Sequence, residues 1–273
     1  MTAVRRLCAL LMVLLIGVAV VAASGCGTKE EASKKISQKE DANTGGESEL
    51  AYDDSPENPV VIYRTSQAIA PVYNPDAPKV IIFGDGTLVK KEGPYTFSAS
   101  ELDDGVQGVL DALEKKGFYE LDEEYPTEEP LAGGTTEYLT VNLADSSHTV
   151  TVESGATPPS SWSDIKDLVE SPPSTEIGEY VPDEVVLYAN PVTEQPGGST
   201  ERQWPGDPSE LAGASSESDT QKADARLEGE SANTAWEAVQ EAFEEDGGDT
   251  VWNAGGKLYT YVYATPVFPG VEE

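Results

Sequence analysis

Thiols and imidazoles are scarce in this chain, which contains two cysteines and one histidine among 273 residues. Both cysteines, Cys8 and Cys26, lie close to the N-terminus. The remaining chain therefore has no thiol for a disulfide, a catalytic nucleophile or a zinc site. We expect its stability to come from a packed core, and the length is sufficient for one large domain or two small ones.

Basic side chains are also few: 17 lysines and arginines stand against 50 acidic residues, a formal net charge of -33. Proteins bind nucleic acids and anionic headgroups mainly through lysine and arginine contacts to phosphate, so we expect no nucleic-acid partner. The acidic surface is typical of a soluble domain, and it leaves open cation binding or capture of a basic protein. The acidic runs at 122–124 and 244–246 lack the ligand spacing of a calcium loop, so we predict no metal site and no cofactor.

Only one long apolar run is present in the sequence, over residues 7–23. Arg5 and Arg6 precede it, and the small residues at 23–25 lead directly to Cys26. This order of charged, apolar and small residues is that of a secretory signal. A signal of this kind would export everything that follows it.

Residues 1–26 resemble a bacterial lipoprotein signal peptide. The resemblance implies that residues 1–25 are removed and that the Cys26 thiol takes a diacylglycerol, which would anchor the protein at the extracytoplasmic face of the cell membrane. An uncleaved membrane anchor stays open, because a 17-residue run lies at the lower edge of what spans a bilayer, and so does simple secretion. Removal of the two arginines in the signal would leave 15 basic against 50 acidic side chains.

Two later segments lack the patterns of regular structure. Residues 26–58 are rich in Lys, Glu, Ser, Asn and Gly, which predicts a flexible polar tether. Residues 190–222 are rich in Pro, Gly, Ser and acidic side chains, which predicts a long surface excursion that Trp204 pins to the domain. We predict a single folded domain over residues 59–268, interrupted by this excursion.

The folded region is predicted to belong to the α+β class, with a mainly antiparallel sheet packed by about three helices. Short β-branched and aromatic runs predict strands, and turn residues such as those at 84–86 favour tight connections between them. The predicted strands cover residues 60–65, 79–83, 87–91, 139–143, 148–152, 184–188 and 257–265.

Apolar residues at helical spacing predict the helices, and capping signals predict their ends. For the first helix, Ser98 and Glu101 have the spacing of a capping box, and Gly117 closes the far end. The second is a short helix capped by Ser161. The third is expected to begin near Thr234 and to end at the following glycine pair. The closing segment is too small to fold alone, so we expect it to dock on the first sheet.

Sequence signatures of enzymes are missing. The chain has no Gly-x-Ser-x-Gly elbow, phosphate loop or dinucleotide fingerprint. His148 falls on the core side of its predicted strand, and we interpret it as a partly buried, hydrogen-bonded ring. Two carboxylates suited to glycoside hydrolysis would occur by chance among 50 acidic residues. We therefore predict that the protein is not an enzyme.

Tyr259, Tyr261 and Tyr263 alternate along the last predicted strand, so we expect them on one face. Such a stripe could stack on the sugar rings of a cell-wall glycan, or it could simply cover a packed sheet face. These tyrosines are the candidate ligand-binding residues, and Cys26 is the candidate lipid attachment site.

The order of elements carries one more resemblance. A strand, a helix ending at Gly117, strands at 135–143 and 148–152 and a short helix are similar to small bacterial metalloprotease inhibitors of the emfourin kind. That family commonly has a glycine pair early in the domain, where this chain has residues 66–68, Ser-Gln-Ala, and we carry over no inhibitory residues. We predict a non-catalytic binding or interaction domain. The alternatives are a protease inhibitor and a cell-wall hydrolase.

Overall fold

The computed structural model describes residues 50–67, 77–128, 132–215 and 224–271, which all belong to one compact unit. The predicted signal at 1–25, Cys26 and the tether as far as residue 49 lie outside the described residues. The fold is α+β, with thirteen described strands in two mainly antiparallel sheets and four described α-helices. None of the described helices is long and apolar enough to cross a membrane.

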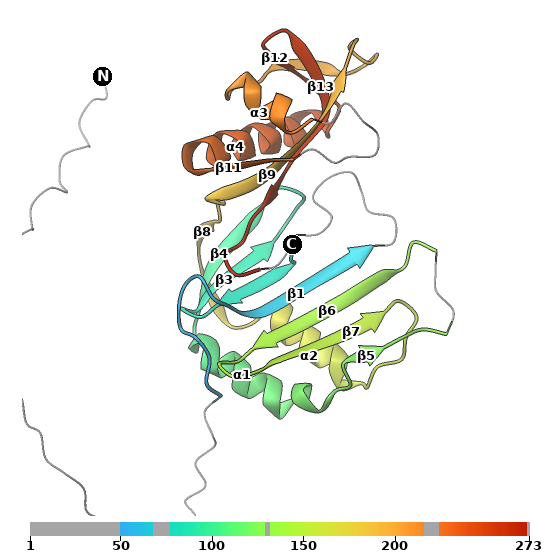
Figure 1. Ribbon diagram of the computed structural model, residues 1–273. Helices are drawn as coiled ribbons and strands as arrows, with labels where there is room; N and C mark the ends of the chain where they lie inside the picture. The colour runs from blue at the N-terminus through green and yellow to red at the C-terminus, as the bar shows by residue number, and fades with distance from the viewer. Residues whose placement is uncertain (1–49, 68–76, 129–131, 216–223, 272–273) are drawn as a thin grey trace, which may run out of the picture. The chain divides into compact units, whose positions relative to one another are not determined.

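The first sheet has eight strands in the order β5-β7-β6-β1-β2-β3-β4-β8 (Figure 1). All neighbours pair antiparallel except β5 and β7, which are parallel. The strands are β1 (Pro59–Gln67), β2 (Val80–Phe83), β3 (Thr87–Lys91), β4 (Phe97–Leu102), β5 (Glu124–Tyr125), β6 (Thr135–Asn142), β7 (Ser147–Glu153) and β8 (Ser174–Glu179).

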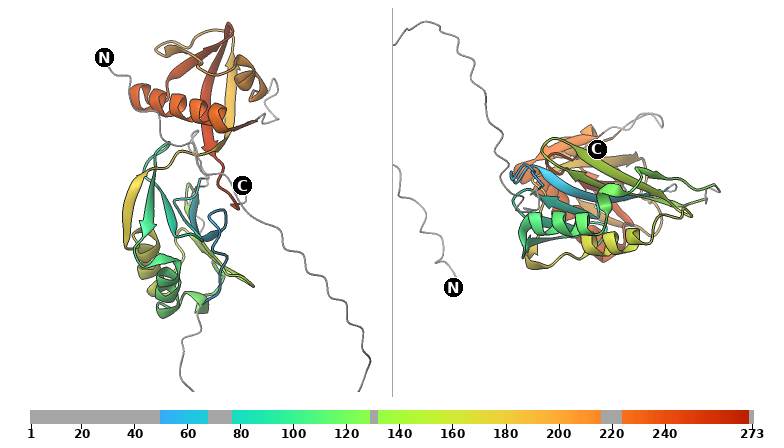
Figure 2. Two further views of the ribbon diagram at one scale, coloured as in Figure 1. Left: turned by 90° about the vertical axis from the view of Figure 1, so that its left-hand side faces the viewer. Right: turned by 90° about the horizontal axis from the view of Figure 1, so that it is seen from below.

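Two helices, α1 (Gly105–Lys115) and α2 (Ser161–Glu170), lie side by side against this sheet (Figure 2). A single 3-10 turn, η1 (Phe118–Glu120), follows α1. The predicted apolar faces form the core: Val106, Val109, Leu110 and Leu113 of α1 and Trp162, Ile165 and Val169 of α2 are all buried. Burial of each such side chain stabilises the fold by roughly 1.5–3 kcal/mol.

The predicted start of α1 is wrong. Ser98 and Glu101 lie in β4, whose backbone pairs with β3 on one side and β8 on the other. Asp104 has non-helical dihedrals, and Gly105 has a φ of +63°, a conformation in which glycine avoids the steric cost of a side chain. The helix therefore begins only after this turn. The end was predicted correctly, because Gly117 is left-handed with a φ of +75°.

Residues 50–58, which we assigned to the tether, contact the first sheet. The Ala144 amide donates to the Ala51 carbonyl (2.8 Å), and the Gly84 amide donates to the Asn58 carbonyl (2.9 Å). A Cβ atom on Gly84 would lie 2.0 Å from the Asp53 carbonyl oxygen, so this close approach requires glycine. The packed part of the chain therefore includes residues 50–58.

The second sheet has five strands in the order β10-β12-β13-β9-β11. Only β10 and β12 pair parallel. Its strands are β9 (Glu184–Val192), β10 (Thr200–Gln203), β11 (Ala225–Glu228), β12 (Thr250–Ala254) and β13 (Lys257–Pro266), and its helices are α3 (Pro208–Gly213) and α4 (Gly229–Asp246).

The predicted excursion at 190–222 contains regular structure, contrary to expectation. It contributes β10 and α3, and β9 extends into it as far as Val192. Asp207 caps α3 by accepting a hydrogen bond from the Ser209 amide (2.8 Å), with Pro208 in the first turn. Trp204 does pin the segment: it is buried, and its ring lies 5.2 Å from that of Trp252.

The closing segment docks on the first sheet as expected. The Trp236 ring of α4 lies 5.8 Å from the Tyr95 ring, which precedes β4, and 5.9 Å from the Phe97 ring of β4. Phe268, just after β13, lies 5.6 Å from the same Phe97 ring. These aromatic contacts belong to a core that combines residues of both sheets. Such pairs contribute about 0.5–1.5 kcal/mol each beyond their buried area.

A candidate ligand site at an aromatic hollow

The three candidate tyrosines of β13 do not share a face. Thr260 pairs with Asn190 of β9, but Tyr263 pairs with Tyr188, so β13 has one extra residue at this point. Such an insertion is a β-bulge, and it reverses which side of the sheet the later residues face. The prediction of a continuous stripe is therefore wrong, because simple alternation assumes an uninterrupted strand.

Each tyrosine has a different environment as a result. Tyr259 is 2% exposed and belongs to the core, whereas Tyr261 is 60% exposed. Tyr263 is half-buried and stacks on Tyr188, with ring centroids 4.7 Å apart. Only Tyr261 and Tyr263 remain candidates for contact with a ligand.

Tyr261 also has a strained backbone. Its φ is +49°, and no other non-glycine residue in the described part of the chain has a positive φ. A left-handed conformation costs a residue with a side chain roughly 1–2 kcal/mol. Strain of this kind and bulges both occur preferentially next to functional sites, where they re-aim a side chain.

Tyr261 and Tyr263 line a hollow of about 210 Å³. Its wall contains five aromatic residues contributed by the β3–β4 connection, α4, β12 and β13: Tyr95, Phe243, Trp252, Tyr261 and Tyr263. Tyr95 and Phe243 meet edge to face, with centroids 5.3 Å apart and ring planes at 65°. Asp249 and Thr250 add polar side chains to the wall, besides the hydroxyl groups of the three tyrosines.

The hollow lies at the C-terminal end of α4. Gly247 and Gly248 line it directly after the helix, and both have positive φ values, +64° and +92°. The Gly247 amide donates to the Phe243 carbonyl (2.9 Å), which closes the last turn of the helix. A left-handed glycine in this position is the usual way to end a helix, and here it leads the chain past the hollow into β12.

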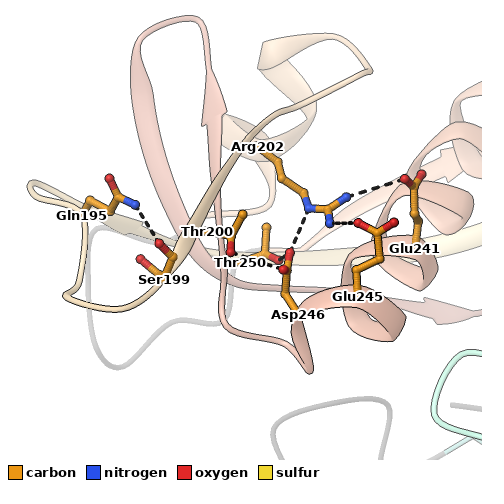
Figure 3. Close-up of polar contacts among 8 residues, drawn as sticks. All are labelled: Gln195, Ser199, Thr200, Arg202, Glu241, Glu245, Asp246 and Thr250. Carbon is orange, nitrogen blue, oxygen red and sulfur yellow. Dashed lines mark hydrogen bonds and ion pairs between the residues drawn. The ribbon is translucent and has the colours of Figure 1, made fainter.

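An ion cluster fixes the chain beside the hollow (Figure 3). Arg202 of β10 donates from Nε to Asp246 (2.9 Å), forms an ion pair with Glu245, and lies 3.6 Å from Glu241. The hydroxyl of Thr250 also donates to Asp246 (3.0 Å). The edge strand β10 is thereby held to the last turns of α4 and to the start of β12.

Two further contacts support the cluster. The Thr200 hydroxyl donates to the second oxygen of Asp246 (3.2 Å), and the Gln195 side chain donates to the Ser199 carbonyl (2.9 Å) in the connection before β10 (Figure 3). Burial raises the pKa of Asp246, but the hydrogen bonds from Thr250 and Arg202 outweigh it and lower the pKa overall. Asp246 is therefore a charged anchor for its neighbours.

A second polar cluster, around Glu137 of β6, is structural. Its carboxylate accepts hydrogen bonds from Lys166 Nζ (2.9 Å) and Trp162 Nε1 (3.0 Å), both on α2, and from the Tyr63 hydroxyl of β1 (3.1 Å). Burial raises the pKa of Glu137, but the hydrogen bonds from Lys166 and Trp162 outweigh it and lower the pKa. The cluster ties α2 to the first sheet.

His148 lies away from the hollow, on β7 opposite Val141. Its ring is partly buried, as predicted, and meets the Phe118 ring edge to face at 5.0 Å. The predicted hydrogen bond is not found at Nε2, which is buried with no partner among the described residues. Within the same part of the chain, no group of three or more His, Cys, Asp or Glu residues could hold a metal ion.

Comparison with known proteins gives no match to a family model, to a curated protein or to a solved structure. The resemblances to lipoprotein signals and to emfourin-like inhibitors stay predictions. The candidate site therefore depends on its own geometry. Local sequence signals predicted the glycine pair after α4, but they do not reveal the bulge at Tyr261 or the pairing of Arg202 with residues about 40 positions later.

Proposed function

We propose that this protein is a lipid-anchored extracytoplasmic protein with a non-catalytic binding domain, and that the aromatic hollow is its ligand site. The observation that carries the proposal is Tyr261. Tyr261 is 60% exposed and held at a φ of +49°. It lowers the stability of the fold in two ways, through backbone strain and through a ring that is not buried. Contact of this ring with a ligand would account for both.

The size of the hollow limits the ligand. Sites for drug-sized molecules have volumes of roughly 300–1,000 Å³, whereas this hollow has about 210 Å³. It is suited to a single ring or a compact headgroup, part of which stays in solvent beside Tyr261. A terminal sugar of a cell-wall glycan and a side chain of a basic protein are both of this size.

The sequence supports the proposed location. An apolar run that leads to Cys26 would place a lipid at the start of the mature chain, and the polar residues after it would separate the domain from the membrane. Mass spectrometry of the protein extracted from membranes tests this part. We expect a diacylglycerol on an N-terminal Cys26, and an intact Met1 or an unmodified thiol would contradict the proposal.

The proposed ligand site is tested by a screen of wall-glycan fragments and small organic cations, with intrinsic tryptophan fluorescence as the readout, because Trp252 lines the hollow. Tyr261→Ala should weaken binding of any hit by roughly threefold or more. Ile177→Ala is the matched control, because Ile177 of β8 is also exposed (62%) but does not line the hollow. The site is rejected if hits bind Tyr261→Ala as well as the wild type, or if neither class of compound binds.

A further inference from the structure

The walls of the hollow have the chemistry of a cation site. Five of the residues that line it are aromatic, and Tyr95 and Phe243 form a corner with their ring planes at 65°. The face of an aromatic ring carries partial negative charge, so several rings around one cavity attract a cation, and this arrangement recognises quaternary ammonium groups.

The end of α4 adds a second, independent source of negative potential. This helix has 18 residues and finishes at Asp246, directly before the two glycines that line the hollow. The C-terminus of a helix carries the equivalent of roughly half a negative charge, and the effect is strongest within the last turn. The last turn contains no basic residue of its own.

The charged side chains around the hollow also leave an excess of negative charge. Arg202 lies beside the hollow and is shared by three carboxylates, Glu241, Glu245 and Asp246. Asp249 adds a carboxylate in the wall itself, and none of the described residues that line the hollow is basic. The long-range field has the same sign, because the chain has a net charge of -33.

We propose that the hollow binds a free, small quaternary ammonium compound, whose cationic head contacts the aromatic rings while its polar tail stays in solvent. This inference depends on the hollow being the ligand site. It favours a cation over a neutral sugar ring, because the aromatic faces, the end of α4 and the Asp249 carboxylate all attract positive charge.

The direct test is a calorimetric titration of the full chain with choline and, separately, with its neutral carbon isostere, 3,3-dimethylbutan-1-ol. The two compounds have the same shape and differ in charge. We expect choline to bind at least about tenfold more tightly, and its affinity to fall as salt concentration rises. Equal affinity for both compounds would overturn the inference.

Two variants separate ring contact from charge. Tyr261→Ala should weaken choline binding roughly threefold to thirtyfold, the range of a single cation–π contact. Asp249→Asn should weaken choline binding but leave binding of the neutral isostere unchanged. The Ile177→Ala control should bind both compounds as the wild type does. Loss of isostere binding in Asp249→Asn would contradict a role for its charge.

The remaining outcomes distinguish this inference from the proposed function. If glycan fragments bind in a Tyr261-dependent way and choline does not, the hollow remains the ligand site and the cationic ligand is rejected. If no cation and no glycan fragment binds, both are rejected. If choline binds only as part of a phosphatidylcholine vesicle, the proposal of a free solute is overturned.

Discussion

The strain at Tyr261 gives a sharp prediction for two substitutions at one position. Both Tyr261→Ala and Tyr261→Gly remove the exposed ring, but only glycine relieves the positive φ of 49°. Relief of this backbone strain stabilises the glycine variant by roughly 1–2 kcal/mol. Glycine also loses more conformational freedom on folding, which costs about 0.5–1 kcal/mol relative to alanine. We therefore expect Tyr261→Gly to be more stable than Tyr261→Ala by about 0.5–1 kcal/mol.

Urea unfolding of the two variants measures this difference, and the melting temperature should differ by about 2 °C for a domain of this size. Ile177 of β8 is the matched control, since it is exposed and has no positive φ. There the order should reverse, with the glycine variant less stable than the alanine variant. If glycine is also the less stable choice at Tyr261, the backbone there is not strained and the reasoning is refuted.

Three further changes test the architecture of the folded domain. Leu110→Ala removes a side chain with no exposed surface and should lower the free energy of unfolding by about 2–5 kcal/mol in urea titrations; a loss below 1 kcal/mol would contradict the core assignment. Glu137→Gln should lower the free energy of unfolding by about 1–2 kcal/mol at pH 7, because the charge-assisted hydrogen bond to Lys166 is lost. The folded pKa of Glu137 lies below its ordinary value of 4.5, so its contribution is fully present above pH 4.5 and is lost as the pH falls through the folded pKa. In Glu137→Gln, the free energy of unfolding should lack this part of its dependence on pH. A pH profile equal to that of the wild type would argue against the cluster. Arg202→Gln should speed amide exchange in β10 while leaving exchange in β6 unchanged, as measured by hydrogen-exchange mass spectrometry. Equal exchange rates of β10 in wild type and variant would show that Arg202 does not hold this edge strand.

Local patterns predicted the elements whose partners are close in sequence. The strand at 87–91 was predicted with its observed ends, because it follows a tight turn and pairs with the strand before it. The apolar face of α1 was also predicted, since helical spacing records burial directly.

Elements that depend on distant partners were missed. The four residues of β10 form a strand because they pair with β12, about fifty residues later, and nothing in the sequence Thr-Glu-Arg-Gln favours a strand on its own. The strand β4 was assigned to a helix start because its Ser and Glu have capping-box spacing, whereas their backbone groups are satisfied by β3 and β8.

The sequence predicted only part of the candidate site, because the prediction considered the last strand without its pairing to β9. Alternating tyrosines indicated an aromatic surface on the last strand. Tyr259 is buried in the core, however, and one extra residue in β13 after Thr260 accompanies the exposure of Tyr261. Bulges come from the pairing of two strands, so the pattern of a single strand does not reveal them. Among the other walls, Tyr95 comes from a distant part of the chain, which only the fold brings beside residues 239–252.

The most direct test of the ligand site uses three of the four tryptophans as local probes. All three are buried, but Trp252 lines the hollow, whereas Trp162 and Trp236 do not. In NMR spectra recorded during a titration with choline, we expect the indole N–H signal of Trp252 to shift in a saturable way while those of Trp162 and Trp236 stay in place. A Trp252 signal that does not move, or equal small shifts at all tryptophans, would contradict the assignment of the hollow as the ligand site.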